Sequence, residues 1–166
     1  MIFGLSYPVI DILLQTLVWA AMLATLLISQ YQLRAMRGGA EAQNTIALIN
    51  YLQMPDIRAA RTTVIRQLNG RRFPEWADEE RQAADLVCSS YQAAAILILK
   101  QKIVPQAVFV ESWGPSIVRC YEILREYVED LQRTENAGPY YWKDFRALYE
   151  ASKKRLGRRG PTTMSE

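Results

Sequence analysis

The sequence predicts an all-α protein in which one N-terminal transmembrane helix precedes a small cytoplasmic bundle of about five helices. Three observations support this fold class. Residues 12–33 contain no charged side chain. Beyond them, apolar residues recur at intervals of three and four, the period of a helix that buries one face. No segment alternates apolar and polar residues as a strand would, and no hairpin dipeptide lies between β-branched runs.

The stretch from Ile12 to Leu33 is long enough to cross a bilayer. At about 1.5 Å per residue it extends to about 33 Å, which matches a hydrocarbon core of about 30 Å. Arg34 and Arg37 follow it directly and mark the inner boundary. We therefore expect the lipid bilayer to be the partner of residues 12–33.

Three alternatives to a membrane span exist for residues 12–33. A cleaved signal peptide begins with basic residues and has a shorter apolar core. A helix lying on the membrane surface needs a charged face, and residues 12–33 have none. A buried core helix stays open as an alternative, because the stretch carries polar side chains at Gln15, Thr16, Thr25, Ser29, Gln30 and Gln32. The membrane span accounts best for the uncharged length.

The distribution of basic residues predicts the orientation. All 20 Lys and Arg residues lie after residue 33, and the cytoplasmic flanks of membrane helices are enriched in Lys and Arg. We therefore expect the N-terminus outside and the C-terminal domain in the cytoplasm. The expected location is the cell inner membrane or the plasma membrane.

Small residues follow one face of the apolar stretch. Ala20 and Ala24 are spaced by four and share that face with Thr16. Small residues at this spacing allow two helices to approach closely in lipid. A homodimer through Ala20 and Ala24 is one hypothesis, and the other interpretation is that alanine is simply common in membrane helices.

The chain is expected to have three parts. These are an N-terminal segment with the anchor at residues 1–37, a cytoplasmic α-helical domain at residues 38–157 and a disordered tail at residues 158–166. Gly38-Gly39 marks the first boundary, because glycine weakens a helix. About 120 residues in the middle part are enough for one small domain with its own core.

Two helices are predicted between this boundary and residue 70. The first runs from Ala40 to Gln53. Pro55 begins the second, since proline is tolerated in the first turn of a helix, and Asn69-Gly70 ends it. The predicted buried face of the second helix is Ile57, Ala60, Val64 and Leu68, and its predicted exposed side chains are Arg58, Arg61 and Arg66.

A long third helix is predicted from Pro74 or Asp78 to Gln101. The acidic run that begins at Glu75 suits its N-terminal end, because carboxylates interact favourably with the positive end of a helix dipole. Apolar and small residues step by three and four along it. This seam consists of Ala84, Val87, Tyr91, Ala94 and Ile98.

Two or three helices are predicted in the last third of the chain. A short helix begins at Val104-Pro105, and Trp113-Gly114-Pro115 is predicted to break or kink it. A longer helix then runs from Pro115 to Arg133. A loop ends at Pro139, and the last helix runs from Tyr140 to about Leu156, with a buried stripe of Trp142, Phe145, Leu148 and Tyr149.

The composition limits the chemistry. The chain has no histidine and two cysteines, Cys88 and Cys120. The commonest general base is therefore absent, and a zinc site lacks enough ligands. In a reducing cytoplasm we expect both thiols to be free and buried. The net charge of +3 is too small to indicate a nucleic-acid partner. We predict no catalytic residue, no metal and no cofactor, although an enzyme that uses Asp, Glu, Lys or Tyr stays as a less favoured interpretation.

Four groups of residues invite a functional interpretation, and for each a structural one is favoured. The carboxylates between Glu122 and Asp130 suit a divalent cation but are more typical of a solvated helix face. The segment Glu111–Pro115 would line a pocket, or its Trp would close the end of a core. The aromatic residues of Tyr140–Phe145 would stack a ligand, or pack in the core. The basic segment Lys153–Arg159 would dock on lipid, or complement its own helix dipole.

A set of dispersed residues, mostly aromatic or small, runs through residues 41–155. It consists of Leu52, Gln53, Pro55, Arg58, Arg61, Trp76, Ala83, Ala84, Val87, Cys88, Trp113, Gly114, Tyr141, Trp142 and Phe145. This set resembles a bacterial family of small helical proteins with a domain of unknown function, many of which have one N-terminal transmembrane helix. The resemblance implies an all-α cytoplasmic domain behind an anchor. It implies no activity, substrate or catalytic residue.

Two classes of function follow from these expectations. The first is a single-pass membrane protein whose cytoplasmic bundle acts as a protein-interaction module at the inner leaflet. The alternative is an accessory or regulatory subunit of a membrane enzyme or transporter, or an enzyme that uses carboxylates. A polar cavity around Glu111 or Arg119 would favour the alternative, and an exposed apolar patch on the bundle would favour the first class. The sequence does not predict which protein is bound.

Overall fold

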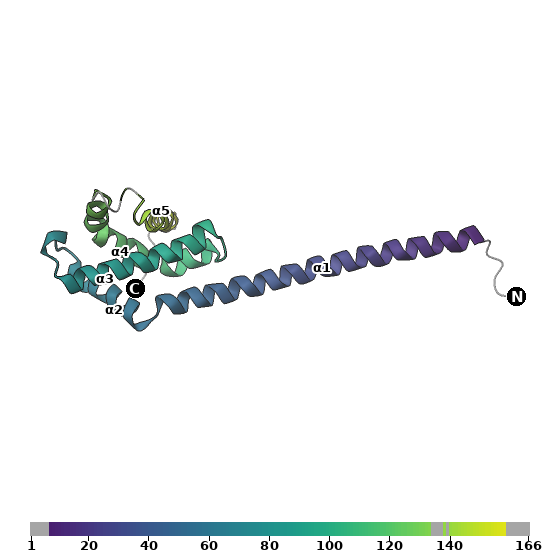
Figure 1. Cartoon of the computed structure of the whole chain (residues 1–166), viewed down its shortest axis with the longest axis horizontal. Helices are drawn as coiled ribbons and strands as arrows, with labels where there is room; N and C mark the ends of the chain where they lie inside the picture. Colours follow the sequence, from purple (N-terminus) through teal and green to yellow (C-terminus); the bar gives the residue numbers. More distant parts are fainter. Residues whose placement is uncertain (1–6, 134–137, 139, 159–166) are drawn as a thin grey trace, which may run out of the picture. The chain divides into compact units, whose positions relative to one another are not determined.

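The computed structural model describes residues 7–133, 138 and 140–158, and the side chains of all of these except residues 7–10 and 37. Figure 1 shows helices joined by short connections, and the described residues contain no strand. The α-helices are α1 (Tyr7–Leu52), α2 (Pro55–Thr63), α3 (Asp78–Ala95), α4 (Gln106–Arg133) and α5 (Lys143–Gly157). Two π-helical turns, η1 (Val64–Leu68) and η3 (Ile96–Lys100), extend α2 and α3, and a 3₁₀ turn, η2 (Phe73–Glu75), precedes α3. The predicted all-α fold class is confirmed.

The chain forms two compact units, Met1–Ala40 and Glu41–Glu166. The first unit contains most of α1. The second contains the last turns of α1 and the other helices, and we call this second unit the bundle. Residues 159–166 of the predicted tail lie outside the described residues, as do residues 134–137 and Pro139 of the predicted loop.

The helix α1 continues through Gly38-Gly39, so the prediction that these glycines close the first helix is wrong. Two glycines cost a helix about 2 kcal/mol relative to alanine. Ordinary helix-forming residues lie on both sides of the pair, and the backbone hydrogen-bond ladder runs unbroken across it. The helix ends at Leu52, where Pro55 begins α2 as predicted.

The predicted buried face of α2 and η1 is confirmed, since Ile57, Ala60, Val64 and Leu68 are all buried. Gly70, at a φ of +82°, follows the end of η1. Glycine adopts this left-handed conformation without the strain that a side chain would add. The Asn69-Gly70 stop therefore occurs where the sequence predicts it.

The start of α3 is stabilised by its acidic first turn. The Ala77 N–H donates to the Glu80 carboxylate at 2.8 Å, and Arg71 forms an ion pair with the same carboxylate. The hydrogen bond from Ala77 holds the pKa of Glu80 below its ordinary value, and Arg71 adds to this effect. Further along the helix, the predicted seam of Ala84, Val87, Tyr91, Ala94 and Ile98 is fully or almost fully buried.

The helix α4 is continuous across Pro115, so the two helices predicted on either side of it are one. A proline in a helix interior loses one backbone hydrogen bond and costs about 3 kcal/mol. Packing on both sides offsets this cost, because Phe109 and Val110 before the proline and Ile117 and Cys120 after it are all buried in the same core. The register of buried residues is therefore kept through the proline.

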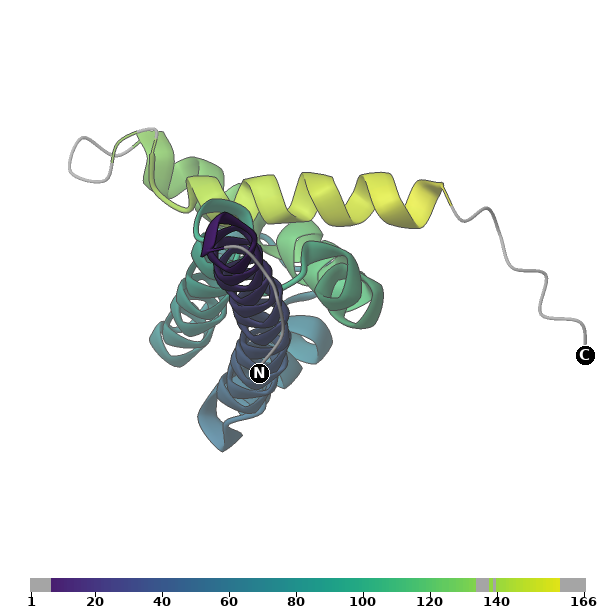
Figure 2. The same ribbon diagram turned by 90° about the vertical axis from the view of Figure 1, so that its right-hand side faces the viewer.

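The helix α5 packs across α3 and α4. It is seen end-on above them in Figure 1 and along its length in Figure 2. A Cβ atom at Gly114 would lie 3.6 Å from Leu156 Cδ1, an ordinary van der Waals distance, so α4 and α5 are in contact at this position. Near the other end of α5, Phe145 stacks on Tyr91 at 5.2 Å between ring centroids and meets Tyr121 edge-on at 5.1 Å. Aromatic residues from three helices thus form the centre of the core.

Candidate functional site

Large apolar side chains cover α1 on all sides between residues 12 and 36, and each is more than half exposed. They are Ile12, Leu13, Leu14, Leu17, Val18, Trp19, Met22, Leu23, Leu26, Leu27, Ile28, Leu33 and Met36. Exposed apolar surface costs about 25 cal/mol per Å² in water. A helix that is apolar on all sides and has no polar face is typically buried in a protein core or spans a membrane.

Two helical stretches of the described chain are long and apolar enough to cross a membrane, judged by length and composition alone. The first, Asp11–Leu52, has a mean hydropathy of 2.0 over its most apolar window, and none of that window is buried. The second, Asp78–Lys100, reaches 1.3, and 44% of its window is buried. The second stretch is apolar because its seam belongs to the core of the bundle, so only the first lacks a cover.

The threonines of the apolar helix satisfy their hydroxyl groups locally. Thr16 Oγ1 donates to the Leu13 carbonyl oxygen at 2.9 Å, and Thr25 Oγ1 donates to the Ala21 carbonyl oxygen at 2.8 Å. A hydroxyl that bonds to its own helix backbone loses little when it leaves water. Part of the polar content of residues 12–33 is therefore compatible with an apolar environment.

Arg61 is buried in the bundle, at 8% exposure, so its predicted place on the exposed side of α2 is wrong. Its Nη1 donates to the Leu52 carbonyl oxygen at 2.7 Å. Its guanidinium carbon lies 4.8 Å from the ring centroid of Trp113, which is cation–π distance. Arg61 therefore connects the end of α1 with α2 and α4. Its spacing of four from Ile57 was the signal that it borders the buried face.

We expect Arg61→Met to lower the free energy of unfolding of the bundle by about 2 kcal/mol. The substitution removes the cation–π contact and leaves the buried Leu52 carbonyl without its donor. Urea unfolding of the full chain in a neutral detergent, followed by far-UV circular dichroism, measures the change. Arg58→Met on the exposed side of the same helix is the control, and an equal loss in both variants would contradict the role of Arg61.

A small polar cluster lies beside Arg61 between α3 and α4. The Tyr91 hydroxyl and Ser116 Oγ form a hydrogen bond of 2.9 Å. Burial raises the pKa of the Cys120 thiol to about 11, although Ser116 and Arg61 oppose part of the shift. Burial also raises the pKa of Tyr91 and of Cys88 well above their ordinary values. Both cysteines are free and buried, as expected, and these shifts keep them as neutral, weakly nucleophilic thiols.

We expect the bundle to lose stability between about pH 9 and pH 11. The Cys120 thiol has an ordinary pKa of 9.0 and a folded-state pKa of about 11, so the unfolded chain ionises first as the pH rises. The free energy of unfolding is therefore unaffected by this thiol below pH 9 and falls as the pH approaches 11. The total loss for this group is about 3 kcal/mol. Urea unfolding at pH 7 and pH 10.5 measures it. Cys120→Ala should show a smaller decline, and an equal decline would contradict the assignment.

Asp144 joins the end of α3 and η3 to the start of α5. Its Oδ2 accepts from Lys100 Nζ at 2.7 Å and from Gln92 Nε2 at 2.9 Å, and the Gln92 amide oxygen accepts from the Phe145 N–H at 2.8 Å. This network satisfies the polar groups beside the aromatic centre of the core. Its geometry is that of a structural connection between helices.

The acidic residues predicted between Glu122 and Asp130 lie on one face of α4, and three of them pair with basic residues. Glu122 pairs with Lys153 at 3.9 Å, Glu126 with Arg72 at 3.8 Å and Glu129 with Arg133 at 3.7 Å. In the part of the chain that the structure describes, no three His, Cys, Asp or Glu residues gather as they would around a metal ion. These carboxylates are partners of basic residues on the surface.

The aromatic segment Tyr140–Phe145 divides between core and surface. Phe145 is fully buried, whereas Tyr140 is 74% exposed. Trp142, at a φ of +56°, precedes α5 and is half-buried. The Trp113 of the segment Glu111–Pro115 stacks on Phe109 at 6.1 Å between ring centroids, within a continuous helix and not at a break. Neither segment gathers its aromatic rings around an open site.

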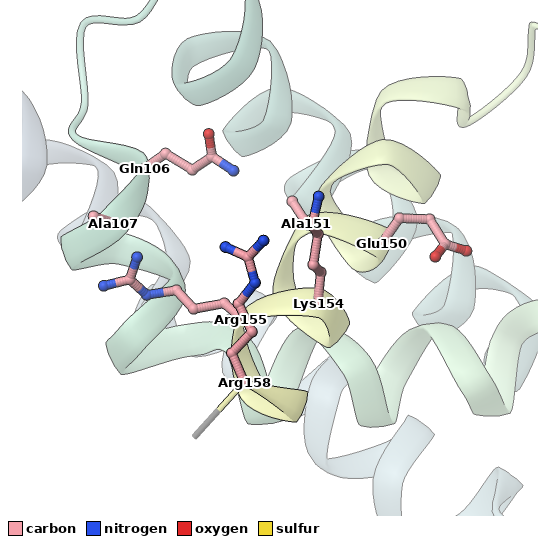
Figure 3. Close-up of a pocket in the computed structure, with 7 residues that line it drawn as sticks. All are labelled: Gln106, Ala107, Glu150, Ala151, Lys154, Arg155 and Arg158. Carbon is pink, nitrogen blue, oxygen red and sulfur yellow. The ribbon is translucent and has the colours of Figure 1, made fainter. Parts of the chain in front are cut away.

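Two grooves on the surface of the bundle are lined by exposed ionisable groups. The first, of about 910 Å³, is shown in Figure 3 and lies between α5 and the start of α4; its residues are Gln106, Ala107, Glu150, Ala151, Lys154, Arg155 and Arg158. We call it the basic groove. The second, of about 440 Å³, lies beside Gly70; its ionisable residues are Arg71, Arg119, Glu122, Arg125, Glu126 and Glu129. We call it the mixed groove. The sequence pointed to the C-terminal basic residues but gave no sign that the start of α4 faces them.

These features define a class of protein: a small all-α bundle that follows an N-terminal apolar helix without a cover in the structure. The chain belongs to the family named for a domain of unknown function, DUF4760, whose family model matches residues 19–152. The resemblance expected from the sequence is thereby confirmed at the level of the family. Neither a curated protein nor a solved structure matches the chain.

Proposed function

We propose that the chain is a single-pass membrane protein whose bundle acts as a protein-interaction module at the cytoplasmic face of the membrane. The observation that carries the proposal is the apolar helix, whose large side chains between Ile12 and Met36 are all more than half exposed. A lipid bilayer is the cover that suits a helix of this length and apolar surface. If the apolar helix were instead a core helix, the surface of another protein would have to bury it. If it were a signal sequence, it would be cleaved and the mature protein would have no anchor.

The proposed orientation has the N-terminus outside and the bundle in the cytoplasm. Its support is the absence of Lys and Arg before residue 34, against 20 of them after the apolar helix. The location that follows is the inner membrane or the plasma membrane.

Exposed apolar side chains near the end of α1 support the interaction module. Ile46 is 59% exposed and Met54 is 52% exposed, on either side of the buried Leu48 and Leu52. We therefore expect Ile46→Asp combined with Met54→Asp to prevent partner binding. The measurement is capture of the tagged full chain, crosslinked in its membrane, followed by identification of the proteins that are enriched.

Tyr140→Asp is the control, because it places the same charge on an exposed aromatic side chain elsewhere on the bundle. The proposal predicts a defined set of proteins with the wild type and the control and its loss in the double variant. It is wrong if the double variant captures the same set.

The mixed groove favours the alternative function, an accessory or regulatory subunit of a membrane enzyme or transporter, or an enzyme that uses carboxylates. It combines Arg119 with the carboxylates of Glu122, Glu126 and Glu129. In that case the captured partner would be a membrane enzyme or transporter in fixed stoichiometry, and Arg119→Gln would weaken the association. Arg58→Gln serves as its control.

A second copy of the chain is a proposed partner for the apolar helix. We expect Ala20→Cys to give a disulfide-linked dimer under mild oxidation in membranes, because Ala20 and Ala24 allow close approach of two helices. Met22→Cys, about 200° around the same helix, should give much less. Non-reducing gel electrophoresis measures the dimer. Equal crosslinking at both positions, or none at position 20, would contradict the homodimer.

A further inference from the structure

The basic groove combines three cations with one acid. Lys154 and Arg155 come from the last turn of α5, Arg158 follows the helix directly, and Glu150 lies one turn before Lys154. Figure 3 shows the two guanidinium groups between α5 and the start of α4, whereas the Glu150 carboxylate points away from them. Groups of this kind recognise phosphate, because guanidinium and ammonium donors form charge-assisted hydrogen bonds with its oxygens.

Most of this positive charge is left without an internal partner. Arg155 Nη2 lies 3.7 Å from Glu111 Oε2, so this arginine is held against α4 by an acid. Within the described residues, neither Lys154 nor Arg158 forms an ion pair. Two cations therefore remain available at the groove for an anion from outside the chain.

Apolar side chains are exposed at the start of α4 and in the connection before it, close in sequence to Gln106 and Ala107 of the groove. Val108, which follows Ala107 in α4, is 56% exposed, and Ile103 in the preceding connection is 36% exposed. Lys102 is exposed next to Ile103. Basic groups with apolar neighbours are typical of surfaces that bind anionic membranes, where the cations meet headgroups and the apolar side chains enter the interface.

We propose that the basic groove binds the phosphate of an anionic phospholipid headgroup, with Lys154 and Arg158 as the principal contacts. The inference rests on the proposed function, since an anchored bundle meets headgroups at a high effective concentration. Free phosphate offers the same chemistry to the cations, but it makes no use of the apolar side chains at Ile103 and Val108. A lipid therefore matches both parts of the surface.

The test is a titration of the full chain, held in a neutral detergent, with phosphatidylglycerol, and native mass spectrometry counts the lipids bound. The variant Lys154→Gln with Arg158→Gln removes two charges from the groove. The control Arg58→Gln with Arg66→Gln removes two charges from α2 and η1, and neither arginine forms an ion pair within the described residues. Far-UV circular dichroism confirms that each variant folds.

The proposal predicts that the groove variant binds phosphatidylglycerol about tenfold more weakly than the wild type, while the control stays within about twofold. Binding should also weaken as salt is raised. Equal weakening in both variants, or equal affinity of the wild type for phosphatidylcholine, would overturn it. If inorganic phosphate alone binds the wild type as tightly as the lipid does, the ligand is free phosphate and the lipid assignment is wrong.

This failure is distinguishable from failure of the proposed function. The titration supplies the lipid in solution, so it reports on the groove whether or not residues 12–33 span a membrane. A wild-type chain that sodium carbonate releases from membranes would contradict the anchor alone. A groove variant that binds lipid like the wild type but stays in the membrane would contradict the groove alone.

Discussion

Replacing Phe145 by alanine is expected to lower the free energy of unfolding of the bundle by about 4 kcal/mol. Phe145 is fully buried, and its ring contacts Tyr91 from α3 and Tyr121 from α4. The substitution removes apolar contact area and two aromatic pairs, and it leaves a cavity where three helices meet. A loss of this size is a large part of the stability of a small domain.

Urea unfolding of the full chain in a neutral detergent, followed by far-UV circular dichroism, measures this loss. Tyr140→Ala is the matched control, because Tyr140 begins the same segment but is 74% exposed. We expect the control to change the stability by less than about 1 kcal/mol. A loss below about 1 kcal/mol for Phe145→Ala would mean that the aromatic centre is not where the structure places it.

Replacing Leu23 by arginine is expected to remove most of the chain from the membrane fraction. Leu23 lies at the middle of the apolar stretch, and a charged residue at the centre of a membrane helix costs about 3 kcal/mol on insertion scales. Leucine itself favours insertion, so the total change exceeds the cost of the charge alone. The proposed anchor therefore predicts a protein that is degraded or stays outside the membrane instead of inserting.

The measurement is the amount of chain that pellets with membranes, resists carbonate and then floats with the lipid in a density gradient, which aggregates do not do. Ala42→Arg is the control, because Ala42 is exposed on the same helix beyond the glycine pair. We expect this control to pellet as the wild type does. If Leu23→Arg also pellets like the wild type, the apolar stretch is not what holds the chain.

Regular periodicity made α2 and α3 predictable from the sequence. Along α3 the residues from Ala84 to Ile98 step by three and four, and each step returns to the same buried face. The start of α2 and the stop after η1 were equally predictable. Proline favours the first turn of a helix at Pro55, and glycine readily adopts the positive φ found at Gly70. Local signals of this kind need no knowledge of what packs against them.

Three predictions were wrong because the local residue type was outweighed by tertiary packing or by the continuity of a long helix. Pro115 destabilises an isolated helix, but buried residues on both sides keep α4 continuous. Gly38-Gly39 likewise does not interrupt α1. Arg61 reads as an exposed cation until the Leu52 carbonyl and the Trp113 ring are seen beside it. In each case the deciding contact comes from a residue distant in the sequence or from the continuity of the surrounding helix.

The candidate sites follow the same division. The cluster of basic residues at the end of α5 is evident in the sequence. Their position against Gln106 and Ala107, which makes a groove of them, depends on how α5 crosses α4. Sequence alone could therefore suggest a basic segment that contacts lipid, but not the groove in which we propose that a phosphate binds.

The measurement that tests the membrane anchor most directly is carbonate extraction combined with a topology assay on the full chain. A reporter is placed at each end, and the membranes are washed at alkaline pH before the reporters are read. We predict that the chain stays in the pellet with its C-terminus in the cytoplasm and its N-terminus outside. A chain that is released into the supernatant, or one whose C-terminus lies outside, would contradict the account.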